Sequence, residues 1–323
     1  MMVAVVVTMR NEEQTIGTLL EALAAQTRAA DEVILVDGGS TDGTVAAARA
    51  HAPQLPALRL LEAPGSNIAR GRNHGIEAAK SPIIAVTDAG CVPARDWLAR
   101  ITSPLEFDPE LGLVQGVVVP QPASHLEACI GRCSLAFRVT IGNATFNPTA
   151  RALAFRRGIW AQVCGFPEHP DFFEDAAFIV VVGATGTRLH LEPSAVVHWR
   201  PRRSYREVVQ QFYHYADGLA QGGLSRTFHL RTIAQSVGGL ACASLGILLR
   251  HWLPWTILVL LAGSYVWRKS VQGCFSIPSW RTYYRVPLVL LAIHLGTMAG
   301  VIHGNWLRLQ RRLKHAGTPL SQG

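Results

Sequence analysis

The segment that most constrains the fold is residues 33–44, which reads VILVDGGSTDGT. Its uninterrupted apolar start is typical of a parallel strand that is covered on both faces of its sheet. Gly38 and Gly39 permit a tight turn, and the Ser, Thr and Asp that follow can cap a helix. We therefore expect a strand, a turn and a helix, with Asp37 at the carboxyl end of the strand, where open α/β sheets bind ligands.

Asp37 has two interpretations. A carboxylate at this place accepts hydrogen bonds from a ring N–H or a ribose hydroxyl but repels phosphate, so it suits the nucleoside end of a nucleotide. It can equally stabilise the turn that follows it, because Asp side chains bond to backbone groups two residues on. The segment by itself leaves both interpretations open.

Three other segments complete a recognisable order. Residues 3–13 read VAVVVTMRNEE, residues 67–75 read NIARGRNHG, and residues 83–91 read IIAVTDAGC. Together with residues 33–44 they give a strand, N-E-E, a second strand with V-D-x-G-S-x-D-G-T, R-N-x-G, and a third strand with an aspartate motif. With these motifs in this order, the chain resembles family 2 glycosyltransferases of the GT-A fold from residue 3 to about residue 220.

The resemblance implies that residues 1–225 form a GT-A-like α/β domain, with a mostly parallel sheet flanked by helices, which binds a nucleoside-diphosphate sugar. It assigns the donor to side chains at strand ends and in the turns that follow, namely Thr8, Glu12, Asp37, Arg72 and Asp88. His198 matches the place where related enzymes contact the diphosphate or a metal, and Arg200 follows it.

The metal site departs from the family pattern. The family commonly has a second acid in the motif Asp88-Ala89-Gly90, and this chain has Gly90 in its place. Mg²⁺ and Mn²⁺ prefer oxygen ligands, so one carboxylate makes a weak site. Asp88 and His198 remain candidate ligands for a divalent cofactor, although a lone His is often structural. Without a metal, Arg200 and the arginines after it can bind the diphosphate.

The general base is expected shortly before position 180. Residues 165–168 read GFPE and residues 173–176 read FEDA, which resembles the family segment that carries the base of inverting enzymes. The resemblance assigns this role to Asp175, with Glu174 as second candidate. The helix dipole favours an ionised carboxylate at such a helix start, but a carboxylate there can also be a simple cap.

The C-terminal third contains apolar segments. Residues 233–249 and 253–267 carry no charge and fit two short membrane spans joined by a tight turn, while 286–302 is a third candidate. Tryptophan and tyrosine at the ends of the segments are typical of a membrane interface. We expect a membrane module over 226–308 with two to three such segments, followed by a basic tail over 309–323. A buried helical core is the alternative.

Orientation follows from charge. If the first two segments form a hairpin that starts inside, the catalytic domain is cytoplasmic and the protein is a multi-pass membrane protein. A third full span would then place the basic C-terminus outside, so the third segment is re-entrant or interfacial, or the positive-inside rule is broken. The amphipathic stretch 204–222 before the first segment either packs in a core or lies at a bilayer surface.

The net charge of +8 also bears on partners. No basic helix interleaved with aromatic residues indicates nucleic acid, so we attribute the charge to membrane lipid and diphosphate. The expected function is inverting transfer of a hexosyl or related sugar from a nucleoside-diphosphate sugar to a lipid-linked or envelope-glycan acceptor, as in polysaccharide biosynthesis at the cell membrane. The alternative, prompted by Gly90, is a catalytically weak or inactive membrane protein that binds a nucleotide sugar.

Overall fold

The computed structural model describes residues 1–134, 139–141, 144–169, 173–222 and 279–316, together with single residues and pairs or triplets between 244 and 277. The chain divides into two compact units. The first comprises Met1–Gln121 with Leu135–Arg200, and the second comprises Pro122–Ser134 with Pro201–Gly323. This division differs from the expected boundary at residue 225, because the helix over 205–221 packs against a later helix of the second unit.

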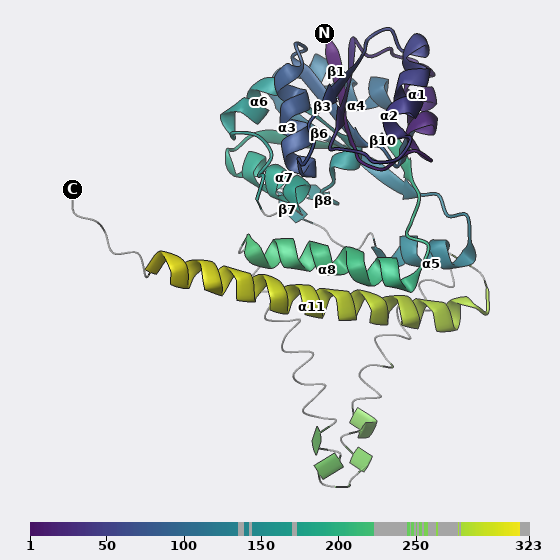
Figure 1. Cartoon of the computed structure of the whole chain (residues 1–323), viewed down its shortest axis with the longest axis vertical. Helices are drawn as coiled ribbons and strands as arrows, with labels where there is room; N and C mark the ends of the chain where they lie inside the picture. The colour runs from purple at the N-terminus through teal and green to yellow at the C-terminus, as the bar shows by residue number, and fades with distance from the viewer. Residues whose placement is uncertain are drawn as a thin grey trace. The chain divides into compact units, whose positions relative to one another are not determined.

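The first unit is built on an eight-stranded sheet in the order β3-β2-β1-β4-β9-β6-β10-β5 (Figure 1). The strands are β1 (Val3–Met9), β2 (Glu32–Asp37), β3 (Leu58–Glu62), β4 (Ile83–Asp88), β5 (Cys91–Pro93), β6 (Leu111–Pro120), β9 (Leu153–Arg156) and β10 (Arg188–Trp199). The first four in sheet order are mutually parallel, β9 is antiparallel to β4 and β6, and β10 is parallel to β6 and antiparallel to β5. A short hairpin, β7 (Val139–Ile141) and β8 (Ala144–Phe146), lies outside this sheet. The predicted α/β fold is confirmed, and the parallel part of the sheet is β3-β2-β1-β4.

Helices cover both faces of the sheet because successive side chains of a strand point to opposite sides. Val5 and Val7 of β1 pack into one apolar cluster with α1 (Ile16–Ala24), α2 (Thr44–His51) and α4 (Trp97–Phe107). Ala4 and Val6 pack into the other cluster with α3 (Ile68–Ala78) and α7 (Glu174–Ala184). Burial on both faces explains why the β1 and β2 sequences are continuous apolar runs rather than alternating ones.

The register of the central strands positions the candidate site. β1 lies between β2 and β4, with Met9 opposite Asp37 and Thr8 opposite Asp88. The two aspartates therefore flank the carboxyl end of β1 from its two sides, as expected from the sequence.

The second unit contains three described helices, α5 (His125–Ser134), α8 (Tyr205–Gln221) and α11 (Thr282–Ala316). Helices α8 and α11 lie side by side (Figure 1). Their contact is close because Gly296, Gly300 and Gly304 recur every four residues along α11, and a Cβ at any of them would collide with a backbone carbonyl oxygen of α8. These glycines therefore let the two helix backbones approach each other.

The expected membrane module is only partly within the described residues. The first two apolar segments, 233–249 and 253–267, lie mostly outside them. The third lies in α11, which is longer than the predicted 286–302 and continues to Ala316, so the first part of the expected basic tail is helical. Within the described ranges, one helix is long and apolar enough to cross a membrane, Thr282–Arg311. The expected multi-pass arrangement is therefore not supported by this part of the chain.

Candidate donor and catalytic site

A buried arginine joins the ends of two distant segments. Arg72 projects from α3 and is 1 % exposed. One terminal nitrogen donates to Oδ1 of Asp88 at 2.8 Å, and the other donates to Oε1 of Glu174 at 2.5 Å. Burial alone would lower the pKa of this guanidinium, but Asp88 and Glu174 raise it above its usual range. The sequence assigned Arg72 to the donor, and this geometry makes it first of all a link between the β4 end and the start of α7.

Two adjacent carboxyl groups begin α7. Burial raises the pKa of Glu174 to about 7 against the opposing effect of Arg72. Asp175 accepts from the backbone N–H of Ala176 at 2.7 Å and from that of Ala150 at 3.3 Å, and burial raises the pKa of its carboxyl. The N-cap position is Phe173, with a left-handed φ of 77°, so both acids are first-turn residues and neither is the N-cap residue itself. The assignment of Asp175 as base stays a prediction.

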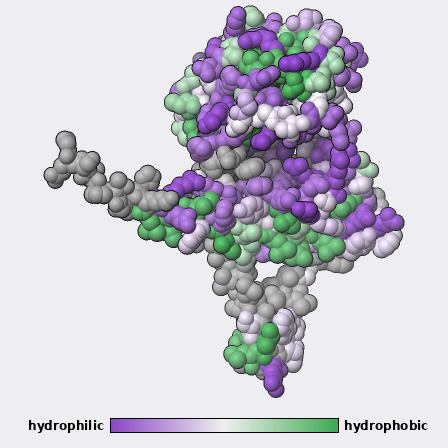
Figure 2. Space-filling view, viewed as in Figure 1, coloured by the Kyte–Doolittle hydropathy of each residue, from purple (hydrophilic) through white to green (hydrophobic). Residues whose placement is uncertain are grey.

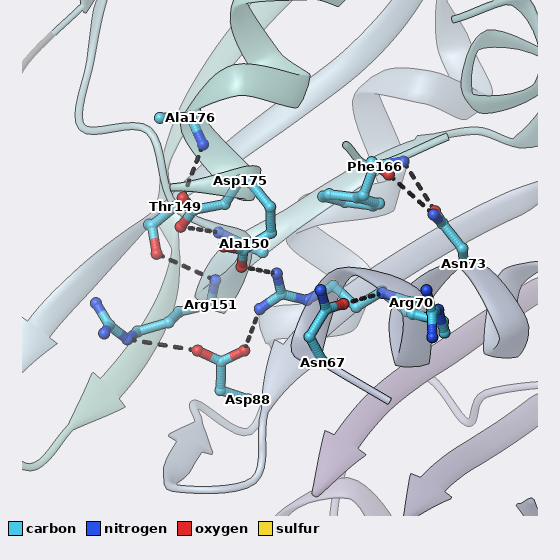
Figure 3. Close-up of polar contacts among 12 residues, drawn as sticks. Asn67, Arg70, Asn73, Asp88, Thr149, Ala150, Arg151, Phe166, Asp175 and Ala176 are labelled. Atoms are coloured by element: carbon cyan, nitrogen blue, oxygen red, sulfur yellow. Dashed lines mark hydrogen bonds and ion pairs between the residues drawn. The ribbon is translucent and has the colours of Figure 1, made fainter. Parts of the chain in front are cut away.

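Arg151 is a site residue that belongs to none of the sequence motifs. It lies in the 3₁₀ turn η2 (Ala150–Ala152), and its Nε lies 3.6 Å from Oδ2 of Asp88 (Figure 3). Its guanidinium carbon lies 4.8 Å above the ring centroid of Trp199, at the end of β10. Because η2 reaches Asp88 only through the pairing of β9 with β4, no local pattern in the sequence could have located this arginine.

The R-N-x-G motif holds the loop that precedes the two acids. The Asn73 side chain accepts from the backbone N–H of Phe166 at 2.8 Å and donates to its carbonyl oxygen at 2.9 Å (Figure 3). Nε of Arg70 donates to Glu168 at 3.2 Å. At the start of α3, Asn67 accepts from the Arg70 N–H and caps the helix. These residues therefore fix the path of the chain toward α7.

At the nucleoside end of the predicted pocket, the candidate carboxylates accept hydrogen bonds from neighbouring residues of the protein. The Asp37 carboxylate accepts from the backbone N–H groups of Gly39 at 3.1 Å and Ser40 at 3.0 Å, and from the Ser40 hydroxyl at 2.5 Å. It thus stabilises its own turn, which is the second interpretation given above. Glu12 accepts from the Thr15 hydroxyl at 2.5 Å, and Thr8 is half-buried in β1. A donor contact for Thr8, Glu12 and Asp37 stays a prediction.

The donor set around Asp88 does not fit a tight divalent metal site. Both Asp88 oxygens face guanidinium groups, Oδ1 toward Arg72 and Oδ2 toward Arg151. Among the described residues, no group of three or more His, Cys, Asp or Glu side chains is arranged to hold a metal, so Asp88 and His198 do not form part of one. His198 is half-buried in β10, and Arg200 follows it at the surface.

The space around Gly90 could accommodate a side chain. Its backbone is not left-handed, and a Cβ added there would have Oε2 of Glu12 as its nearest neighbour, at 3.9 Å. A side chain is therefore sterically possible at position 90. The missing second acid is a matter of composition rather than of backbone strain.

With this geometry in hand, comparisons identify the class of protein. Residues 4–156 match the family described as Glycosyl transferase family 2. The chain is a glycosyltransferase, as the sequence predicted, and this part of it is similar to that family.

Similar proteins agree with this assignment. Glycosyltransferase AglE of Haloferax volcanii is 27 % identical over 239 residues, which cover 72 % of this chain and 77 % of that protein. The uncharacterized glycosyltransferase YibD of Escherichia coli is 35 % identical over 86 residues, 27 % of this chain and 25 % of that protein. These relatives support the enzyme class.

Solved structures support the GT-A fold. The mannosyltransferase PcManGT of Pyrobaculum calidifontis, in complex with GDP-Man and Mn²⁺, has a TM-score of 0.65 at 24 % identity, covering 92 % of this chain and 86 % of that one. Residues 1–349 of S. aureus TarS, in complex with UDP-GlcNAc, have a TM-score of 0.53 at 15 % identity, covering 97 % and 92 %. At these identities the likeness concerns the fold.

Proposed function

We propose that the protein transfers a sugar, with inversion, from a nucleoside-diphosphate sugar to a lipid-linked or envelope-glycan acceptor at the cytoplasmic membrane face. The observation that carries this proposal is the bridge made by Arg72, which holds Asp88 at the sheet end and Glu174 at the start of α7 on one guanidinium. The bridge supports a site in which Asp88 lies near the first turn of α7, which carries both candidate bases, although Asp88 and Glu174 are almost ninety residues apart in the sequence. Complexes of the fold neighbours with GDP-Man and UDP-GlcNAc support the class of donor.

The proposed chemistry is a single displacement. The acceptor hydroxyl oxygen forms a bond to the anomeric carbon from the face opposite the diphosphate, while its proton passes to Asp175. The bond from the anomeric carbon to the diphosphate oxygen breaks, and its electron pair stays on the departing nucleoside diphosphate. Burial raises the pKa of Asp175, which strengthens it as a proton acceptor once ionised.

The second unit supports a membrane location through α11. Large apolar side chains recur along one side of this helix at spacings of three, four or seven residues, and hydrophobic residues are visible along it in Figure 2. The exposed members are Tyr284, Leu288, Leu291, Leu295, Ile302, Trp306, Leu309 and Leu313. Gly296, Gly300 and Gly304 pack on α8 instead. A helix with one packed side and one long apolar side is suited to the surface of a bilayer.

The neighbour of α11 favours an in-plane orientation over a span. Because α8 lies alongside α11, a spanning α11 would carry α8 into the hydrocarbon as well. Helix α8 contains Arg206, Glu207 and Gln210, and charged groups in hydrocarbon are costly. We infer that the pair lies at the membrane surface, which agrees with the interfacial alternative for the third apolar segment and suits a lipid-linked acceptor.

A second candidate function rests on a specific observation. Both oxygens of Asp88 are paired with arginines, and Gly90 supplies no further acid. A protein with this arrangement that binds nucleotide sugars without turning them over is the alternative.

Transfer by the purified full chain tests the proposal. The detergent-solubilised protein is incubated with a panel of nucleotide sugars, including GDP-mannose and UDP-GlcNAc, and with polyprenyl-phosphate acceptors. We expect a lipid-linked product whose anomeric configuration, measured by NMR, is opposite to that of the donor. Retained configuration would refute the inverting mechanism. Binding of a nucleotide sugar with no transfer and no hydrolysis would favour the second candidate.

The orientation of α11 is tested by depth measurements. Single spin labels replace Tyr284, Leu295 and Trp306, which lie on the same exposed side, in the protein reconstituted into vesicles. An in-plane helix gives three similar depths in accessibility measurements. A spanning helix would separate the first and last labels by about 33 Å along the membrane normal, at about 1.5 Å per residue.

A further inference from the structure

Arg151 lies on a turn that connects the two sides of the proposed reaction centre. Its Nε faces Asp88, and the backbone N–H of the preceding residue, Ala150, donates to Asp175 (Figure 3). One short turn therefore orients both the base and a cation. We propose that Arg151 binds the donor's diphosphate and stabilises its charge as the sugar is transferred. This inference rests on the proposed function and assigns a residue to it.

The two arginines at Asp88 differ in how tightly they are held. Arg72 donates a 2.8 Å hydrogen bond from a site that is 1 % exposed. The closest contact of Arg151 to Asp88 is 3.6 Å, which is too long for a hydrogen bond, and its side chain is 19 % exposed. Turning toward phosphate oxygens would therefore cost Arg151 a Coulombic contact but no hydrogen bond to Asp88. The same movement by Arg72 would break its hydrogen bond to Asp88.

Trp199 provides a platform for the guanidinium. The ring lies under Arg151 at 4.8 Å from the guanidinium carbon, and it is itself 8 % exposed and fixed at the end of β10. Stacking restricts the plane of a guanidinium while its N–H groups point outward along the edge. A planar fork of donors matches two phosphate oxygens, which a lysine ammonium does not.

The position of Arg151 beside Asp88 suits it to stabilise the negative charge that develops on the departing diphosphate. As the bond from the anomeric carbon to the diphosphate breaks, its electron pair adds negative charge to the departing phosphate oxygen. The Asp88 environment fits a tight metal ion poorly, because both of its oxygens face arginines. A guanidinium adjacent to Asp88 would supply positive charge where the charge develops.

Calorimetric titration of the solubilised full chain tests this role. GDP and UDP, with guanosine and uridine as their phosphate-free counterparts, are titrated in EDTA into wild type, Arg151→Gln and Arg151→Lys. The matched control is Arg100→Gln, which removes the same charge from an exposed pair on α4. Thermal unfolding of each variant shows whether it is folded, and Arg151→Lys provides the test if Arg151→Gln is not.

We expect Arg151→Gln to weaken binding of the nucleoside diphosphate by about 10- to 100-fold, the usual scale for hydrogen bonds to charged groups. Binding of the matching nucleoside should change by less than about twofold, and Arg151→Lys should lie between wild type and Arg151→Gln. Arg100→Gln should bind both ligands as wild type does.

Three results would overturn the assignment. They are unchanged diphosphate affinity in Arg151→Gln, an equal loss for nucleoside and nucleoside diphosphate, or wild-type diphosphate binding that appears only when Mn²⁺ is added. Failure of the proposed function is a separate result: wild type then binds no nucleoside diphosphate with or without metal, or it binds the nucleoside diphosphate but gives no product in the transfer assay described above.

Discussion

The two halves of the sheet contribute to the site in different ways. In the parallel half, β1, β2 and β4 each end in the residues that the motifs single out, and the turn after each strand follows it directly in sequence. In the mixed half, Arg151 and Trp199 belong to no motif. Arg151 contacts Asp88, and Trp199 contacts Arg151, only because β9 and β10 belong to the same sheet. Motifs therefore report the groups that one segment positions by itself, and they miss groups that the topology brings in.

This contrast is sharpest in the two arginines that face Asp88. Arg72, from the motif-bearing half, is buried between two carboxylates. Arg151, from the other half, is partly exposed and lies over the indole ring of Trp199. We interpret the first as a residue that holds the site together and the second as one that meets the ligand, and substitutions can separate these roles.

The largest expected effect follows Arg72→Leu. It leaves Asp88 and Glu174 without their buried partner, and breaking such a pair costs about 3–5 kcal/mol in the free energy of unfolding. Arg151→Leu, the matched control, should cost less because its contact with Asp88 is longer and its side chain is more exposed than that of Arg72. Urea unfolding followed by tryptophan fluorescence measures both. Equal losses would remove the distinction between the two arginines.

Asp175→Asn should lower turnover by about 100-fold or more, since the change keeps the size of the side chain and removes the base. Nucleotide affinity, measured by titration, should stay near that of wild type because Arg72 is paired with Glu174 and Asp88. Glu174→Gln is the companion variant. If Asp175→Asn turns over normally and Glu174→Gln does not, Glu174 is the base.

Metal dependence tests whether the Asp88 site binds a divalent cation. We expect EDTA to reduce wild-type activity only weakly, whereas Gly90→Asp should bind Mn²⁺ about tenfold more tightly by adding a carboxylate beside Glu12 and Asp88. Gly158→Asp, placed in open space on α6 (Arg157–Gln162), is the control. Electron paramagnetic resonance of free Mn²⁺ measures the affinity. Complete loss of wild-type activity at micromolar EDTA, restored by Mn²⁺ or Mg²⁺, would contradict this expectation.

The smallest expected effect concerns pH. The base must be ionised, and burial raises the pKa of Asp175, so kcat/KM should fall on acidification with a midpoint above that of an ordinary Asp. Arg151 opposes this shift, and Arg151→Gln should therefore move the midpoint further toward neutral pH. The measured midpoint belongs to the Glu174–Asp175 pair. An unchanged or lower midpoint in Arg151→Gln would contradict the proximity of this charge.

The sequence was most informative where burial and local geometry coincide. The apolar runs of β1, β2 and β4 predicted parallel strands because a strand covered on both faces has no polar alternation. The same reasoning placed Asp37 and Asp88 at one sheet edge. It could not identify the groups that contact the Asp88 oxygens, because these groups come from α3 and η2.

Other predictions depended on contacts between distant segments. The sequence of 204–222 fits either core packing or a bilayer surface, and the partner of this helix is α11, about ninety residues later. The hydropathy of the third apolar segment predicts a short span. Hydropathy does not detect that Gly296, Gly300 and Gly304 are spaced to pack against another helix, which is α8. The roles of Arg70 and Asn73 likewise depend on residues 166–168, which lie more than ninety positions later in the sequence.

The grouping of acids around two arginines has a thermodynamic consequence for the donor. When Asp88, Glu174 and Asp175 are all ionised, Arg72 and Arg151 leave one negative charge unmatched before any diphosphate arrives. The incoming anion therefore favours retention of a proton by the carboxyl pair, so donor binding is coupled to proton uptake and tightens as the pH falls. Transfer needs that proton to leave Asp175. Donor binding thus favours the protonated form of this carboxyl pair, and sugar transfer favours its ionised form. The pH of highest activity therefore lies between the pH that favours binding and the pH that favours transfer.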